Sequence, residues 1–187
     1  MKISETRIIL VPGEGEAGAN HWLSRWQTRL ATARRLQPLA HGASALAHDV
    51  AALRKAVQEE GALPVVLVCH AAGCHVALHA VHDFPQGRVR GAFLVAPPLV
   101  HGPQARAAGM PPVPHGQLPF PSVLVASRND PAADYARSEA LAGALGASFV
   151  DAGEAGGLDD ASGFGPWPEG LLRFGTFLRS LGPATPV

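Results

Sequence analysis

Residues 65–76 read V-V-L-V-C-H-A-A-G-C-H-V, an apolar run followed by a tight turn of small residues and a new helical pattern. This layout is typical of a nucleophile elbow, in which the motif G-x-S-x-G presents a reactive hydroxyl on a sharp strand-to-helix turn. Cys69 stands at the first glycine of the motif, Ala71 stands at the nucleophile, and Gly73 keeps its type. Because a methyl group cannot attack a carbonyl, the turn lacks the group that acyl transfer needs.

A cysteine could in principle replace the missing hydroxyl. Cys69 precedes the tip of the turn by two residues, and Cys74 lies in the helical pattern that follows. A thiolate nucleophile needs an accessible, electropositive setting and usually a histidine partner. His70 is adjacent in the sequence, but neighbouring side chains on a sharp turn diverge. The sequence therefore favours buried, unreactive thiols.

Three histidines follow the turn at helical spacing, His75, His79 and His82. Imidazoles at positions i and i+4 of a helix can bind one metal ion. The same spacing is typical of a surface or interface stripe, which is the interpretation that the sequence favours. No metal site is predicted, and a metal-assisted enzyme stays as an alternative.

The hydrophobic pattern places these residues on alternating strands and helices. Strands are expected at residues 7–12, 35–39, 64–68, 91–96, 122–126 and 147–150. Helices are expected at residues 44–60, 72–83, 132–145 and 169–181. One more helix is expected after an N-cap at Asn20, with Trp22, Trp26, Leu30 and Ala33 on one face. Residues 97–121 form a long Pro- and Gly-rich connection without apolar periodicity.

Alternating strands and helices predict an α/β fold with a doubly wound, mainly parallel sheet and helices on both faces. Ligands of such folds bind at the carboxyl ends of the strands, near the topological switch point. Loops 13–19 and 69–73 are expected to meet there. The loops that hold Asp130 and Gly157 follow later strands at the same edge.

The composition is that of a globular protein, with 47% hydrophobic and 16% charged residues among 187. A chain of this length is expected to form one domain over residues 1–187, with a tail at 182–187 that frays. No stretch approaches the ~20 apolar residues of a membrane helix, and M-K-I-S-E-T-R at the start holds no apolar signal core.

Fifteen basic and fifteen acidic residues give a net charge of zero, so a nucleic-acid partner is not expected. A cytoplasmic location is expected, and two cysteines are too few for a disulfide framework. The sequence indicates no cofactor, and it does not specify a protein partner.

Several segments together resemble the small α/β-hydrolase family that contains the YdeN-like proteins and retinoblastoma-binding protein nine, which are serine hydrolases. The matching segments outside the elbow are V-P-G at 11–13, H-W-L-S-R-W at 21–26, G-A-F-L-V-A-P-P at 91–98, L-P-F-P-S-V-L-V-A-S-R-N-D-P at 118–131, G-E-A-G at 153–156 and S-G-F-G-P-W-P-E-G at 162–170. The resemblance covers nearly the whole chain except residues 35–49 and 100–117. It implies a minimal α/β-hydrolase fold without a large lid.

The resemblance also implies where a catalytic triad would stand. The family's acid maps to Asp130, its nucleophile to Ala71, and its base, in the pattern G-H-I-N-A-x-S-G-x-G, to Gly157. The acid is present, although Asn-Asp-Pro is turn chemistry in its own right and favours a structural role. Because triad members act as a unit, the loss of nucleophile and base predicts an impaired enzyme.

The remaining pocket is expected at the same edge, and its predicted lining is Glu14, Gly15, Trp22, Ala71, Ala72 and Gly157. The backbone N–H of Ala72 would serve an oxyanion hole. Acidic side chains gather near this edge, namely Glu14, Asp130, Asp159 and Asp160, with Glu154 close by. Negative charge disfavours an oxyanion and favours a neutral or cationic ligand or a metal ion.

The leading hypothesis is a catalytically impaired relative of the serine hydrolases that binds a small molecule or a protein. One alternative is an active hydrolase of carboxylic esters or amides, with a relocated nucleophile and base. The metal-assisted enzyme is the other alternative.

Overall fold

The computed structural model describes residues 5–14, 17–37, 43–99, 111–114 and 116–182. Six strands form one sheet, and they are β1 Arg7–Val11, β2 Ala33–Arg35, β3 Val65–His70, β4 Val89–Val95, β5 Ser122–Ala126 and β6 Ser148–Asp151. The helices are α1 Trp22–Arg29, α2 Ala43–Glu59, α3 Ala72–Ala80, the short 3₁₀ turn η2 Val81–Asp83, α5 Tyr135–Leu145 and α6 Pro168–Ser180.

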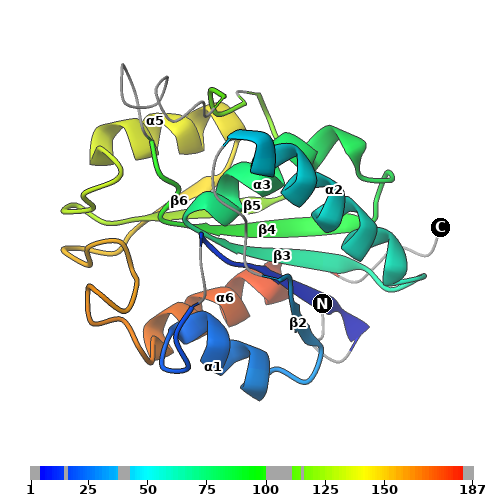
Figure 1. The fold of residues 1–187 in the computed structure, drawn as a ribbon, viewed down its shortest axis with the longest axis horizontal. Helices are drawn as coiled ribbons and strands as arrows, with labels where there is room; N and C mark the ends of the chain where they lie inside the picture. The colour runs from blue at the N-terminus through cyan, green and yellow to red at the C-terminus, as the bar shows by residue number, and fades with distance from the viewer. Residues whose placement is uncertain (1–4, 15–16, 38–42, 100–110, 115, 183–187) are drawn as a thin grey trace.

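The strands lie in the order β2-β1-β3-β4-β5-β6, and every neighbouring pair is parallel. The chain adds β2 on one side of β1 and β3 on the other, so the switch point lies between β1 and β3. This confirms the predicted α/β class with a doubly wound parallel sheet. The carboxyl ends of the strands, and the loops that leave them, lie at the left of Figure 1.

Helices cover both faces of the sheet, as Figure 1 shows, with α2, α3 and α5 above it and α1 and α6 below it. Each face has its own buried core. Leu53, Leu67 and Leu141 belong to the core on the α2, α3 and α5 face. Trp22, Phe93 and Phe174 belong to the core on the α1 and α6 face. The central strand β3 is buried along its whole length because it contributes side chains to both cores.

Most predicted elements are confirmed, and the differences have local causes. Strand β2 is Ala33–Arg35 rather than 35–39, because α1 ends at Arg29 and Ala33 pairs with β1 instead of continuing the helical face. Helix α5 begins at Tyr135 rather than at 132, because the Asp134 side chain accepts the Arg137 N–H and caps it.

Helix α1 is capped by His21, not by Asn20 as the sequence suggested. The Nδ1 atom of His21 accepts the backbone N–H of Leu23 at 3.1 Å. The ring therefore does at this position what a Ser or Asp side chain does at most N-caps.

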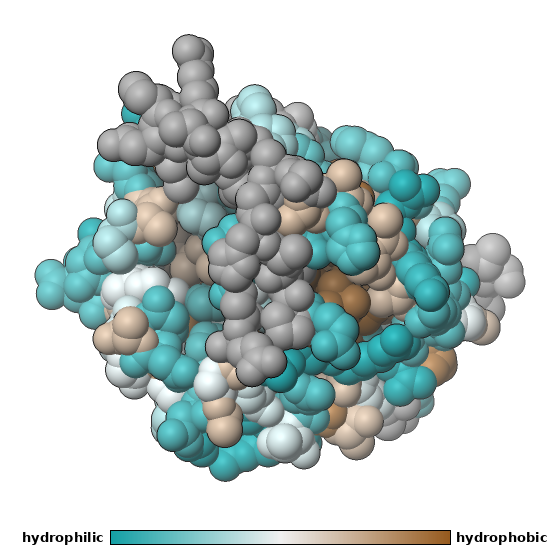
Figure 2. All heavy atoms as spheres, viewed as in Figure 1, coloured by the Kyte–Doolittle hydropathy of each residue, from teal (hydrophilic) through white to brown (hydrophobic). Residues whose placement is uncertain are grey.

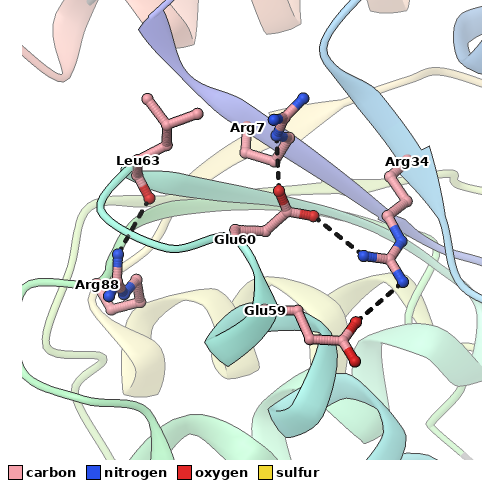
Figure 3. Close-up of polar contacts among 6 residues, drawn as sticks. All are labelled: Arg7, Arg34, Glu59, Glu60, Leu63 and Arg88. Carbon is pink, nitrogen blue, oxygen red and sulfur yellow. Dashed lines mark hydrogen bonds and ion pairs between the residues drawn. The ribbon is translucent and has the colours of Figure 1, made fainter.

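The end of the sheet opposite the loops is held by an ion-pair network, shown in Figure 3. Glu60 follows α2 and meets Arg7 of β1 at 2.7 Å and Arg34 of β2 at 3.4 Å. The Glu60 side chain is only 7% exposed, so water screens these contacts weakly. Arg34 also reaches Glu59 at 3.1 Å. The network ties the end of α2 to both strands.

Hydrophilic side chains cover most of the face in Figure 2, with smaller apolar areas between them. None of the described helices is both long enough and apolar enough to cross a membrane. In the described part of the chain, the strand-to-helix connections include no added lid domain. Residues 100–110 and 115 of the predicted long loop 97–121, and the predicted frayed tail beyond Gly182, lie outside the described residues.

Candidate active site

Ala71 occupies the tip of a true elbow between β3 and α3. Its backbone has φ 47° and ψ −123°, a conformation that a non-glycine residue adopts only when its surroundings impose it. The Ala71 N–H donates to the Val95 carbonyl at 3.0 Å, and the Ala71 carbonyl accepts the Cys74 N–H at 2.9 Å. The turn that normally presents a nucleophile is therefore intact, and it presents a methyl group.

Gly73 is required by a close approach of two backbone segments. A Cβ atom at this position would lie 2.3 Å from the Val11 carbonyl oxygen and 2.5 Å from that of Pro12. No side chain fits there, so the first turn of α3 packs directly on the end of β1. This contact explains why position 73 must be a glycine, as it is in the elbow motif.

Gly157, the residue that the resemblance aligns with the family's base, faces the elbow with its backbone. The Gly157 carbonyl accepts a hydrogen bond from His70 Nε2 at 2.9 Å, and its N–H donates to the Ser162 hydroxyl at 3.0 Å. A bond to a carbonyl fixes the proton of His70 on Nε2. Thus His70, which directly precedes the elbow tip, holds the loop that contains Gly157.

Trp22, predicted to line the pocket, is instead fully buried. Its indole N–H donates to the Leu158 carbonyl at 2.8 Å, and its ring packs edge-on against Trp26 and Trp167. Trp26 and Trp167 are core residues. The role of Trp22 is to fix the loop beyond Gly157, because a buried carbonyl needs a donor.

Two histidines sit together beside the elbow. The rings of His21 and His70 lie 5.0 Å apart, and both side chains are buried. Burial lowers the pKa of His21 to about 4, helped by the nearby His70 and opposed by Asp160 and Asp159. Burial also lowers the pKa of His70, although the Gly157 carbonyl and the same two carboxylates oppose it. Both rings are therefore neutral at neutral pH.

Asp159 and Ser162 brace the rewritten loop. The Asp159 carboxylate accepts the Ser162 hydroxyl at 2.7 Å and the Ser162 N–H at 2.8 Å. Burial alone would raise the pKa of Asp159, but these two hydrogen bonds lower it. The hydroxyl of Ser162 is thus committed to the loop, donating to Asp159 and accepting from Gly157.

The resemblance aligns Asp130 with the family's acid, and in the structure its side chain forms a hydrogen bond within its own turn. Its Oδ1 accepts the Ala132 N–H at 2.8 Å, the bond of an Asx turn. Partial burial raises the pKa of Asp130, the Ala132 N–H lowers it, and the charge of Asp159 raises it. Asp130 thus has a structural bond in its own turn, and its role as an acid stays a prediction.

Both cysteines are fully buried and free. Burial raises the pKa of the Cys69 thiol, with a further rise from Cys74, and burial likewise raises the pKa of Cys74. Thiols in this setting stay protonated, which argues against a cysteine nucleophile.

The histidine stripe on α3 is not the surface feature that the sequence favoured. His75 is buried, and its Nε2–H donates to the Pro98 carbonyl at 2.6 Å. Burial lowers the pKa of His79 as well, and only His82 is exposed. The reason is that the chain returning from β4 covers this side of α3. Among the described residues, no group of three or more His, Cys, Asp or Glu side chains could hold a metal ion.

The remaining predicted pocket residues differ in how exposed they are. Ala72 begins α3, so its N–H is one of the helix-end donors without an intrahelical partner, and it is half-buried. Glu14 is exposed after β1. Gly15 lies outside the described residues. Sequence reasoning gave no role to His21, or to His70 beyond a partner for a thiol. The bond of His70 to Gly157 joins segments 87 residues apart, and the ring contact of His21 with His70 also joins separate elements.

The sheet order, the strained elbow and the loops gathered at one edge define an α/β-hydrolase. The comparisons agree, because the serine hydrolase family model matches residues 8–176. The chain belongs to the serine hydrolase family, and its relatives include the YdeN-like proteins. No curated protein matches the chain.

Solved structures support the same assignment. A YdeN-like hydrolase from Pectobacterium atrosepticum is 31% identical with a TM-score of 0.83, over 97% of this chain and 95% of that one. The YdeN product of B. subtilis is 16% identical with a TM-score of 0.74, over 93% and 99% of the two chains. Esterase 2 of Thermogutta terrifontis is 16% identical with a TM-score of 0.71, over 100% and 88%, which shows a shared fold.

Proposed function

We propose that this member of the serine hydrolase family does not form an acyl-enzyme and instead binds a small neutral or cationic molecule at the elbow. The observation that carries the proposal is the intact elbow with a methyl group at its tip and a backbone carbonyl, bonded to His70, at the position of the base. Neither a nucleophile nor a proton shuttle stands where the family has them.

The preference for a neutral or cationic ligand follows from the charges around the elbow. Asp130 and Asp159 interact electrostatically, and Asp159 and Asp160 both act on the neutral histidines. No described lysine or arginine is among the groups that affect the pKa of His70. Three carboxylates outnumber the one nearby cation, Arg35, whose charge acts on His21, so this edge is unfavourable for a carboxylate ligand.

Calorimetric titration tests the ligand class. We expect a primary amine or a neutral ester to bind more tightly than the carboxylate of the same carbon skeleton. Asp159→Asn, which keeps an acceptor for Ser162, should reduce the difference in binding affinity between the amine and the carboxylate. Tighter binding of the carboxylate by the unmodified chain would contradict the proposal.

The alternative is an active ester or amide hydrolase with a relocated nucleophile, which the family and the esterase-like fold favour. A fluorophosphonate probe separates the two. We expect no labelling of the natural chain. Labelling of any hydroxyl in it, located by peptide mass mapping, would establish the enzyme instead.

Restoring the lost groups is the complementary experiment. Ala71→Ser with Gly157→His should regain probe labelling only after Asp159→Ala is added. A Cβ at Gly157 would lie 2.9 Å from an Asp159 carboxylate oxygen, which must give way. The triple variant without labelling would show that the scaffold itself has changed beyond the triad.

We also propose a cytoplasmic location for the chain, supported by two buried cysteines that are unpaired.

A further inference from the structure

One part of the sheet has less helical cover than the rest. Two helices, α1 and α6, cover the face that belongs to the second core, whereas α2, α3 and α5 cover the other face (Figure 1). Val123 of β5 and Val150 of β6 point to the thinner side and are only partly buried. Parallel sheets normally have both faces covered, and among the described residues no helix covers this corner.

The open corner forms a groove of about 570 Å³ between α6 and the last two strands. Val123, Val150, Phe93 and Phe177 supply apolar wall, and the exposed side of α6 supplies the rim. The groove is lined by residues of β5, β6 and α6 and by Phe93 of β4. It is separate from the elbow, which follows the carboxyl end of β3.

A protruding apolar side chain lies on the same rim. Leu172 is 73% exposed, and the one other large exposed hydrophobic residue among those described is Leu63, at 40%. Leu172 is the apolar member of an otherwise polar exposed stripe on α6. The surface thus combines a protruding apolar side chain, Leu172, with an apolar groove. A self-complementary patch requires both features.

The charges on the rim are self-complementary too. Glu169 and Arg173 stand one turn apart on α6, on either side of Leu172, and pair at 2.6 Å within the chain. Two α6 helices running antiparallel and centred near Leu171 would bring Glu169 of each copy opposite Arg173 of the other. The chain as a whole is neutral, so no net charge opposes its association with itself.

We propose that this groove is the interface of a two-fold homodimer, in which Leu172 of each copy enters the groove of the other. A partner of strong single-sign charge does not match a rim that holds one acid and one base. An isologous contact uses the same patch twice and satisfies both the apolar and the charged parts of the surface.

Sedimentation equilibrium over a concentration series tests the proposal. The natural chain should approach twice its 19.4 kDa mass as concentration rises. Leu172→Glu should raise the dissociation constant at least about tenfold, because a central apolar anchor is lost. Leu63→Glu is the matched control and should leave association unchanged. A natural chain that stays monomeric throughout, or a Leu172→Glu variant that associates normally, would overturn the proposal.

A charge exchange tests the antiparallel geometry separately from the apolar contact. Glu169→Arg and Arg173→Glu should each weaken association, since each leaves like charges facing across the two-fold axis. The double variant should restore association, because both acid–base pairs are re-formed. A double variant that remains monomeric would overturn the α6 pairing.

Discussion

Single residues at the elbow show which features depend on geometry and which on chemistry. Gly73 is fixed by two backbone oxygens that leave no room for a Cβ, whatever the protein does. No comparable packing constraint requires alanine at position 71. A φ of 47° is unfavourable for any residue that carries a Cβ atom. Strain at such a turn normally accompanies a nucleophile. Here it is retained without one.

Ala71→Gly should therefore stabilise the protein by about 1 kcal/mol. Relief of the backbone strain, roughly 1–3 kcal/mol, exceeds the roughly 0.4–1 kcal/mol lost through a more flexible unfolded chain. Urea denaturation measures the change. Ala72→Gly is the control, since Ala72 begins α3 with helical geometry and glycine there should destabilise. An Ala71→Gly variant no more stable than the natural chain would show that the turn is not strained.

At the scale of elements, the loop after β6 is held by the loop after β5. Ser127 is buried, and its hydroxyl donates to Asn129 Oδ1 at 2.8 Å and accepts the Ala155 N–H at 2.8 Å. Asn129 Oδ1 also accepts the Gly156 N–H at 2.7 Å. These bonds set the course of the segment that carries Gly157 toward His70.

Ser127→Ala should cost about 1–3 kcal/mol, because a buried Ala155 N–H loses its acceptor. It should also loosen the loop, which hydrogen exchange at residues 153–157 would report. Ser122→Ala is the matched control, since Ser122 makes one bond to its own turn, to the Phe120 carbonyl. Equal loss of stability in the two variants would contradict a special role for Ser127.

The elements that the sequence predicted well are those with a strong local pattern. Strand β3 is a run of apolar residues buried on both faces, and the turn that follows it is as expected. Strand β2, A-R-R, has no apolar pattern, so only its pairing with β1 defines it. The contacts of His70 with Gly157 and of Trp22 with Leu158 link distant segments, and no local pattern encodes them.

At the scale of the whole molecule, four described histidines are held neutral by burial, and they couple folding to pH. Burial lowers the pKa values of His70, His75 and His79, and it lowers that of His21 to about 4. His21 and His70 lie beside the elbow, whereas His75 and His79 lie on α3. Acid should therefore weaken both sides of the sheet rather than one site.

Stability should fall as the pH drops from about 6.5 toward 4. Below 6.5 the unfolded chain takes up a proton on each of these rings, whereas folded His21 stays neutral until about pH 4. The shift at His21 corresponds to about 3 kcal/mol across this window. Chemical denaturation at several pH values measures it. His21→Asn keeps an acceptor for the Leu23 N–H and cannot titrate, so its stability should depend less on pH. An unchanged pH profile in this variant would show that His21 is not held neutral in the fold.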